Sequence, residues 1–455
     1  MVIAFRIELR RSLGFALGAV LVIVALGVLY GLSGPWGKTS VAWFRQWTAL
    51  ASWLRYMLLF LWPIAIGAGA LQGLRDKRSG VLELMTTASR PRWQRVSQPL
   101  LALAAGLVTA WLALFLVGGV QVIGATSYFS WDWLPVLLVG ALALIAGAWL
   151  GAALGRLVPS ALTPPVLAVS ALVLLALIVT AAEPAAATAG AVPRWFGVLS
   201  PALPTPQDVF TVVDGRMTGA QLAWFAGMAA TAFLVLAAAS VRERLLAVLP
   251  VLLGAAVAVP LYPADVTTVD KSAIELVCSD TVCVRKIHEH ELAALTGPGQ
   301  EALRLLAKLP DPPKSIVEDE VSRAHQGRGA ESTDVVRMDL DQMGFFRRDK
   351  TPTADELTLR LVAGAGTRTC FRPSLSGGPG AIRERAAQAV SAAWVFGKLQ
   401  PLPSANWAES ATAKFAEPAW AKLRTLPADE QLARIQAMRT VAASCEGDPL
   451  GELTR

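Results

Sequence analysis

Long apolar runs alternate with short polar stretches up to about residue 262, after which the chain has the mixed pattern of a water-soluble domain. A helix needs about 20 apolar residues to cross the hydrocarbon layer of a membrane. Seven runs approach that length and predict membrane-spanning helices at 13–32, 49–71, 99–125, 134–154, 162–182, 222–240 and 245–261. The last two are short enough to form one hairpin that enters and leaves on the same side. The first run is longer than that of a signal peptide and lacks a small-x-small cleavage site, so we interpret it as a retained span.

Positive charge is concentrated in the apolar part of the chain. Residues 1–262 carry 17 Lys and Arg against 8 Asp and Glu, whereas residues 263–455 carry 24 against 26. A basic soluble domain is what a nucleic-acid partner requires, so this distribution argues against one. The frequent Ala, Arg and Val with few Lys are typical of a high-GC bacterial genome, which suggests a multi-pass protein of the bacterial cytoplasmic membrane.

The same charges predict an orientation, because cytoplasmic loops are enriched in Lys and Arg. With the N-terminus in the cytoplasm, the inner connections hold most of the basic residues, including Arg75, Arg92, Arg156 and Arg242, and the outer connections hold few. Seven crossings then put residues 263–455 outside the cell. Tryptophans cluster near the predicted outer boundary, where their amphipathic rings are favoured.

The outer region has the composition of an α+β domain. We expect strands at 274–278, 282–286, 334–340 and 357–362, and helices at 289–309, 381–398 and 428–443. The predicted fold class is therefore an α-helical polytopic membrane bundle of about seven transmembrane helices over residues 1–262, followed by a disulfide-containing α+β extracytoplasmic domain over residues 263–455.

All four cysteines lie in this outer region, at Cys278, Cys283, Cys370 and Cys445. An oxidising compartment favours two disulfides, and four cysteines allow three pairings. The stretch "IELVCSDTVCVRK" predicts two short strands around a Ser-Asp turn, which would bring Cys278 close to Cys283. Cys370 and Cys445 then remain to pair with each other.

Two patterns in the outer region invite a catalytic or metal interpretation. Cys278, Cys283, His288 and His290 have the residue types of zinc ligands, but the C-x4-C-x4-H-x-H spacing is not that of the usual fingers. "HEHEL" places its histidines two residues apart, whereas zinc proteases need them four apart on one helical face. We expect an exposed polar helix start there, and no catalytic, cofactor or metal site.

Two further patterns leave alternatives open. Trp43, Trp47, Leu50 and Leu54 share one helical face. That segment either lies along the membrane surface or begins the second span. Small residues recur every fourth position at Gly147, Gly151 and Gly155, which allows close helix packing either within the bundle or between two copies.

The stretch "LRDKRSGVLELMTTASRPRWQRV" joins the second and third spans. Leu74, Val81, Leu84 and Met85 fall on one helical face, and Pro91 marks an end. The pattern predicts a short amphipathic helix near residues 74–90, here called the coupling segment, at the cytoplasmic surface. Taken alone, it is equally the pattern of a solvated basic loop.

This segment resembles the cytoplasmic segment of ABC-2 type transporter permeases, which carries a Gly, a Glu and a Leu, followed by an Arg. The matching positions are Gly80, Glu83, Leu84 and Arg90. The basic N-terminus and the Pro-rich outer stretch "PRWFGVLSPALPTPQDVF" between spans five and six also match the family layout. The seventh span and the outer domain depart from it, because typical members have six spans.

The resemblance implies that the coupling segment docks on a separate ATP-binding subunit, with Arg78, Gly80, Glu83, Leu84 and Arg90 in the contact. No G-x-x-x-x-G-K-[ST] phosphate loop occurs in the chain, so the ATPase is expected in that partner, and the chain itself is not expected to be an enzyme. A homodimer or a second permease subunit would complete the transporter. The family's usual direction is export.

The leading hypothesis is thus an exporter of lipid-like or amphipathic cargo, peptides included, because few charges lie within the spans, with Arg55 the main exception. The outer domain would receive cargo, gate the exit or hold a partner protein. The alternative is a membrane-anchored sensor or assembly factor whose outer domain binds a ligand or partner. A membrane-tethered hydrolase lacks a convincing catalytic group.

Overall fold

The computed structural model describes the chain except for residues 1–12, 33, 79–90, 183–193, 206–207, 320–331, 342, 344, 347–350, 369–378 and 403–408. The chain forms two compact units. Unit 1 comprises Met1–Gly37, Val41–Ala125 and Phe129–Val269, and unit 2 comprises Lys38–Ser40, Thr126–Tyr128 and Asp270–Arg455.

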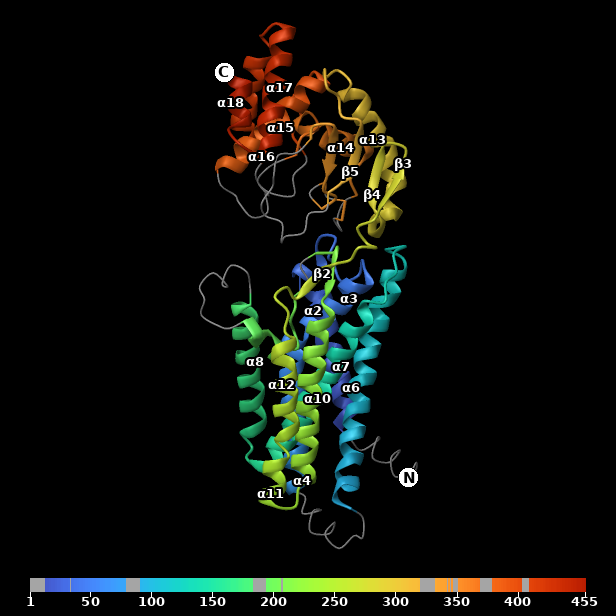
Figure 1. Cartoon of the computed structure of the whole chain (residues 1–455), viewed down its shortest axis with the longest axis vertical. Helices are drawn as coiled ribbons and strands as arrows, with labels where there is room; N and C mark the ends of the chain where they lie inside the picture. Colours follow the sequence, from blue (N-terminus) through green and yellow to red (C-terminus); the bar gives the residue numbers. More distant parts are fainter. Residues whose placement is uncertain are drawn as a thin grey trace. The chain divides into compact units, whose positions relative to one another are not determined.

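The described part of unit 1 contains seven helices that are long and apolar enough to cross a membrane (Figure 1). Each of the seven predicted runs forms one of them, which confirms the helical bundle. Six of them are α2 (Leu13–Gly31), α4 (Leu58–Arg78), α6 (Arg92–Ile123), α7 (Trp133–Leu157), α8 (Thr163–Ala181) and α10 (Gly215–Ala237). The seventh, Val241–Leu261, consists of the short α11 (Val241–Leu246) and α12 (Leu249–Leu261).

The second predicted span is divided in two. Its first part is a separate helix, α3 (Trp47–Tyr56), and the break falls at Met57 before α4 begins. Leu50 and Leu54 on α3 are fully buried in the core of unit 1. The apolar face of α3 is therefore covered by other helices, which differs from an amphipathic helix that lies on a membrane surface.

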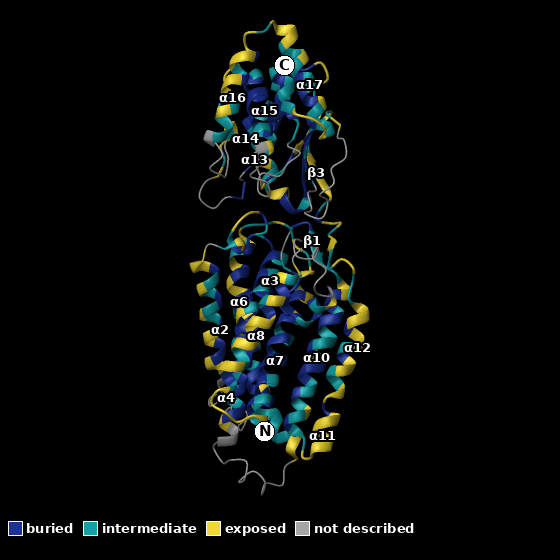
Figure 2. Ribbon diagram, turned by 90° about the vertical axis from the view of Figure 1, so that its left-hand side faces the viewer, coloured by how far each residue is buried: buried dark blue, intermediate teal, exposed yellow. Residues whose placement is uncertain are grey.

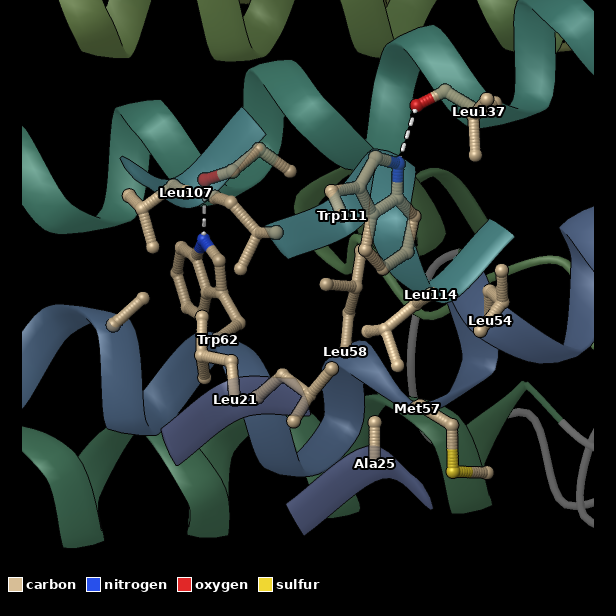
Figure 3. Packing of buried hydrophobic residues seen from close by; sticks show 14 of the residues in the cluster. Leu21, Ala25, Leu54, Met57, Leu58, Trp62, Leu107, Trp111, Leu114 and Leu137 are labelled. Carbon is tan, nitrogen blue, oxygen red and sulfur yellow. Dashed lines mark hydrogen bonds between the residues drawn. The ribbon is translucent and has the colours of Figure 1, made fainter. Parts of the chain in front are cut away.

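The core of unit 1 combines large aromatic side chains with leucines. Trp111 on α6 donates its indole N–H to the carbonyl oxygen of Leu137 on α7 at 2.9 Å (Figure 3). Such a bond matters in an apolar core, because a buried indole N–H without an acceptor is costly. By contrast, α8 and α12 expose many leucines and valines (Figure 2), as helices that contact hydrocarbon do.

A small antiparallel sheet lies at one end of unit 1, and α11 lies at the other (Figures 1 and 2). The sheet pairs β1 (Thr211–Val213) with β2 (Thr267–Val269). Two short 3-10 helices, η1 (Pro35–Gly37) and η2 (Arg194–Leu199), also belong to unit 1. The helix α3 is at the same end as the sheet, whereas α4 ends toward α11.

Unit 2 has a mixed four-stranded sheet with strand order β3-β4-β5-β6. The strands are β3 (Leu276–Ser279), β4 (Val282–Arg285), β5 (Ser315–Glu318) and β6 (Val335–Met338). β3 and β4 form an antiparallel hairpin, and β4, β5 and β6 are parallel. Parallel neighbours require a crossover, and α13 (Leu292–Leu306) supplies the one between β4 and β5. The mixture of helices and a small sheet predicted for this region is confirmed.

In unit 2, η3 (Lys286–Glu291) lies between β4 and α13, and the other helices follow the sheet along the chain. They are α14 (Ala354–Val362), η4 (Ala363–Gly366), α15 (Pro379–Phe396), α16 (Glu409–Leu423), α17 (Ala428–Ser444) and α18 (Pro449–Thr454). Of these, α15 and α17 match predicted helices closely, whereas α16 and α18 were not predicted.

One predicted strand is wrong, because residues 357–362 belong to α14. The helix begins with a capping box in which Thr353 accepts a hydrogen bond from the backbone of Glu356, and Glu356 accepts one from Thr353. The alternating Leu-Thr-Leu-Arg-Leu pattern favours a strand, but the capping box and the buried core beneath Leu357 and Leu361 favour the helix. The strand β5 was missed, and it occupies the interior of the sheet.

Candidate functional site

The coupling segment lies largely outside the described residues. Gly80, Glu83, Leu84 and Arg90 fall in the range 79–90, and Arg78 is the last residue of α4. Residues 74–78 continue α4 instead of beginning a separate helix. On the other side, Pro91 is the N-cap residue of α6, which starts seven residues before the predicted span.

The helix α4 is locked against α7 by a seam of glycines, defined as Gly69 and Gly73 on α4 with Gly147, Gly151 and Gly155 on α7. A Cβ on Gly151 would lie 2.0 Å from the carbonyl oxygen of Ile66, and one on Gly155 would lie 2.2 Å from that of Ala70. In the opposite direction, a Cβ on Gly73 would lie 2.1 Å from the carbonyl oxygen of Ala152. The two backbones are thus in direct contact.

This glycine seam resolves one alternative left open by the sequence. The small residues of α7 pack within the chain, against α4, and are not available to a second copy on that face. Small residues are what permit such close approach, since any side chain would separate the helices.

Tryptophan side chains add hydrogen bonds between the same helices. Trp62 on α4 donates to the carbonyl oxygen of Ala143 on α7 at 2.8 Å, and Trp149 on α7 donates to that of Leu100 on α6 at 3.1 Å. The bond from Trp111 to Leu137 also joins α6 to α7. The two helices that flank residues 79–90 are therefore both held by α7.

A buried polar cluster, the Arg55 clasp, lies in unit 1. It consists of Arg55, Gln221 and the backbone carbonyl groups of Ser200, Pro201 and Leu203. Arg55 is fully buried and donates from Nε to the oxygen of Pro201 at 3.0 Å, and from Nη2 to the oxygens of Leu203 and Gln221. Gln221 in turn donates to the carbonyl oxygens of Ser200 at 3.1 Å and Leu203 at 3.0 Å.

The Arg55 clasp joins three parts of unit 1 that are far apart in sequence. Arg55 belongs to α3, Gln221 to α10, and residues 200–203 to the connection between α8 and α10. A buried guanidinium is stable only when its donors find acceptors, and here those acceptors hold the connecting segment onto the bundle.

In unit 2 the structure pairs Cys278 with Cys283, as the sequence predicts, across the β3–β4 hairpin. The turn uses Asp280 and Thr281, with Asp280 at a φ of 53°, instead of the predicted Ser-Asp pair. Cys445 is also disulfide-bonded. Cys370 lies outside the described residues, so its pairing with Cys445 stays a prediction.

The expectation of an exposed polar helix start at "HEHEL" is wrong for His288. This side chain is 3% exposed, and its Nδ1 lies 2.6 Å from Oε1 of Glu318 on β5. The other oxygen of Glu318 accepts the backbone N–H of Arg285 at 2.7 Å. Phe346 covers the imidazole at a ring-centroid distance of 4.9 Å. His288 therefore connects η3 to the centre of the sheet.

A further acid, Asp341, lies near this pair. Its carboxylate accepts hydrogen bonds from the backbone N–H of Ser40 at 2.7 Å and from the hydroxyl of Ser40 at 2.6 Å. Among the described residues, no group of three or more His, Cys, Asp or Glu is arranged to hold a metal ion. The described geometry gives unit 2 a satisfied polar core cluster.

Comparisons with protein-family models, with curated proteins and with solved structures find no match to this chain. The functional argument therefore depends on the geometry of the chain itself.

Sequence reasoning missed the partners of Arg55 and of His288. The sequence shows Arg55 as a rare charge within an apolar run. Its hydrogen-bond acceptors, Gln221 and the carbonyl groups of Pro201 and Leu203, are more than 140 residues away in sequence. The glycine spacing was the one local signal that pointed to a tertiary contact of the site.

Proposed function

We propose that the chain is the membrane-spanning subunit of an ABC-2 type transporter, driven by a separate ATP-binding subunit at the cytoplasmic side. Its cargo is amphipathic, and it is exported from a bacterial cell. A second copy or a related permease subunit completes the complex. Residues 263–455 form an extracytoplasmic domain in this proposal.

The observation that carries the proposal is the fixation of α4 and α6 on α7. Force applied to a loop moves a helix bundle only if the helices that flank the loop respond as one body. The glycine seam removes the side-chain layer between α4 and α7, and the tryptophan bonds hold α6 to the same helix. A push on residues 79–90 would therefore be transmitted to three helices together.

The length of the helical rod supports the same reading. The helix α4 spans 21 residues, which corresponds to about 31 Å at 1.5 Å per residue, roughly the thickness of the hydrocarbon layer. It continues from α3 across the break at Met57. One nearly continuous rod thus joins the Arg55 clasp at one end of unit 1 to the coupling segment at the other.

The proposal is tested by isolating the tagged full-length chain from its native membrane and measuring the ATPase activity that accompanies it. We expect an ATP-binding subunit to co-purify. The variants Glu83→Ala and Leu84→Ala should each reduce the recovered ATPase about tenfold, because a few contact residues carry most of the affinity of an interface.

Arg242→Ala is the matched control, since Arg242 is an exposed charged residue of α11, at the end of unit 1 toward which α4 ends. It should leave the recovered ATPase unchanged. If no ATP-binding subunit is recovered with the wild-type chain, the transporter is excluded and the sensor or assembly factor is favoured.

A further inference from the structure

Arg55 has no charged partner among the described residues. Its acceptors are the carbonyl oxygens of Pro201 and Leu203 and the amide oxygen of Gln221, and no carboxylate forms an ion pair with it. Its Nη1 atom is buried and makes no hydrogen bond to any described residue. A buried cation normally has a counter-charge, because neutral acceptors replace only part of its lost hydration.

The guanidinium group is built to hold two oxygens of one planar or tetrahedral anion. Its donors form a rigid fork that matches carboxylate and phosphate, and charge-assisted bonds of that kind are the stronger ones. Two backbone carbonyl groups and one amide occupy these directions here. They are weaker acceptors than an anion, so an anionic group that reached Arg55 would compete with them effectively.

A cavity lies beside the same segment. It is partly open to solvent. Ser52, one helical turn before Arg55 on α3, lines it, and so do Pro204 and Thr205, which follow Leu203 directly. The carbonyl groups of Pro201 and Leu203, in the segment that leads to this lining, accept hydrogen bonds from Nε and Nη2 of Arg55.

The lining of the cavity restricts the charge of that ligand. Asp132 and Asp208 both line it, and no Lys or Arg does. A head group with negative charge alone would be repelled by these carboxylates, and one with positive charge alone would gain nothing from Arg55. A head group that carries both charges satisfies the carboxylates and the guanidinium together.

We propose that Arg55 and the adjacent cavity bind the zwitterionic head group of the cargo, with its phosphate or carboxylate on Arg55 and its ammonium group beside Asp132 and Asp208. Residues 200–203 occupy Arg55 when cargo is absent and are displaced when it binds. This assignment rests on the proposed transport function and names the substrate class for it. Because the same displacement frees the connection between α8 and α10, binding also loosens that end of unit 1.

The test uses the full-length chain in micelles of a neutral maltoside detergent, with three probes that share a twelve-carbon tail. They are dodecylphosphocholine, dodecyl phosphate and dodecyltrimethylammonium, and binding is measured by tryptophan fluorescence titration. The wild-type chain should bind the zwitterion about tenfold more tightly than either singly charged probe.

Variants separate the two halves of the site. Arg55→Gln should weaken dodecylphosphocholine binding about tenfold and leave dodecyltrimethylammonium unchanged, and Asp208→Asn should weaken both. Arg55→Lys, which keeps the charge but not the fork, should fall between wild type and Arg55→Gln. A folding defect would weaken all probes alike, so the pattern across probes identifies the site.

Arg156→Gln is the matched control, because Arg156 on α7 likewise donates to a backbone carbonyl, that of Leu236. It should not change the binding of any probe. The proposal is overturned if the wild-type chain does not distinguish the three probes, or if Arg55→Gln weakens the cationic and zwitterionic probes equally. The assay needs no ATP-binding subunit, so its outcome is independent of the co-purification experiment.

Discussion

Glu318 illustrates how single residues stabilise unit 2. Its carboxylate is 2% exposed and accepts two hydrogen bonds, one from the backbone of Arg285 and one shared with the ring of His288. Removing it would take away an acceptor of two buried polar groups, which costs more than the loss of a solvated contact. Glu318 is the last residue of β5, and its carboxylate connects that strand to β4 and η3.

We predict that Glu318→Ala lowers the opening free energy of β4 by about 2–4 kcal/mol, because buried groups lose their partner. Hydrogen exchange of the β4 amides in the full-length chain measures this directly. Glu275→Ala is the control, since Glu275 pairs with Lys286 at 3.0 Å on the exposed surface and should change the value by less than about 1 kcal/mol. Equal effects of the two substitutions would contradict the role assigned to Glu318.

At the scale of elements, the contact between α4 and α7 is the feature on which the proposed function depends. The helices approach through backbone atoms from Ile66 to Gly73 on α4 and from Ala148 to Gly155 on α7, whereas Gly147 faces the side chain of Trp62. Such an interface has no soft side chains that could absorb a displacement.

We predict that Gly151→Ala lowers the stability of the chain by about 1–3 kcal/mol, because the added Cβ would meet the carbonyl oxygen of Ile66. The midpoint of thermal unfolding in detergent should fall accordingly. Gly27→Ala on α2 is the control, since a Cβ there meets nothing within 4 Å. It should leave the midpoint unchanged or raise it slightly, because Ala is the better helix former. An equal fall in the midpoint for both variants would contradict the claim that the close contact between α4 and α7 requires glycine at position 151.

Elements also show where sequence patterns compete. The alternation in residues 357–362 predicts a strand, yet the capping box at Thr353 and Glu356 begins a helix there. The capping pattern, Thr353 followed three residues later by Glu356, is present in the sequence and favours that helix. No comparable local signal marks β5, which has only four residues and comes shortly after Pro312 and Pro313. Its position between β4 and β6 decides its conformation.

At the scale of the whole molecule, charge and hydropathy divide the chain into a basic apolar part and a nearly neutral soluble part. Unit 1 ends at Val269 and unit 2 continues from Asp270, each with its own hydrophobic core. The disulfide between Cys278 and Cys283 lies in the second of these and is typical of an oxidising compartment. The predicted outward position of this unit follows from the distribution of Lys and Arg.

We predict that alkaline phosphatase fused after Arg455 is active in intact cells and that green fluorescent protein fused there is dark. The reason is that alkaline phosphatase becomes active in an oxidising outer compartment, whereas green fluorescent protein does not become fluorescent there. Fusions placed after Arg244, which lies in the predicted inner turn, should show the reverse pattern and serve as the control. A fluorescent fusion at Arg455 would place unit 2 in the cytoplasm and contradict the predicted orientation.

The sequence by itself determined the number and approximate position of the apolar helices and the Cys278–Cys283 pair. These features depend on local periodicity, segment length and short sequence separations, which a linear pattern contains. Only the tertiary structure decided the partners of Arg55, Glu318 and Gly151, which come from segments tens to more than a hundred residues away. Burial creates the need for those partners, and which distant group meets it depends on how the helices and strands pack.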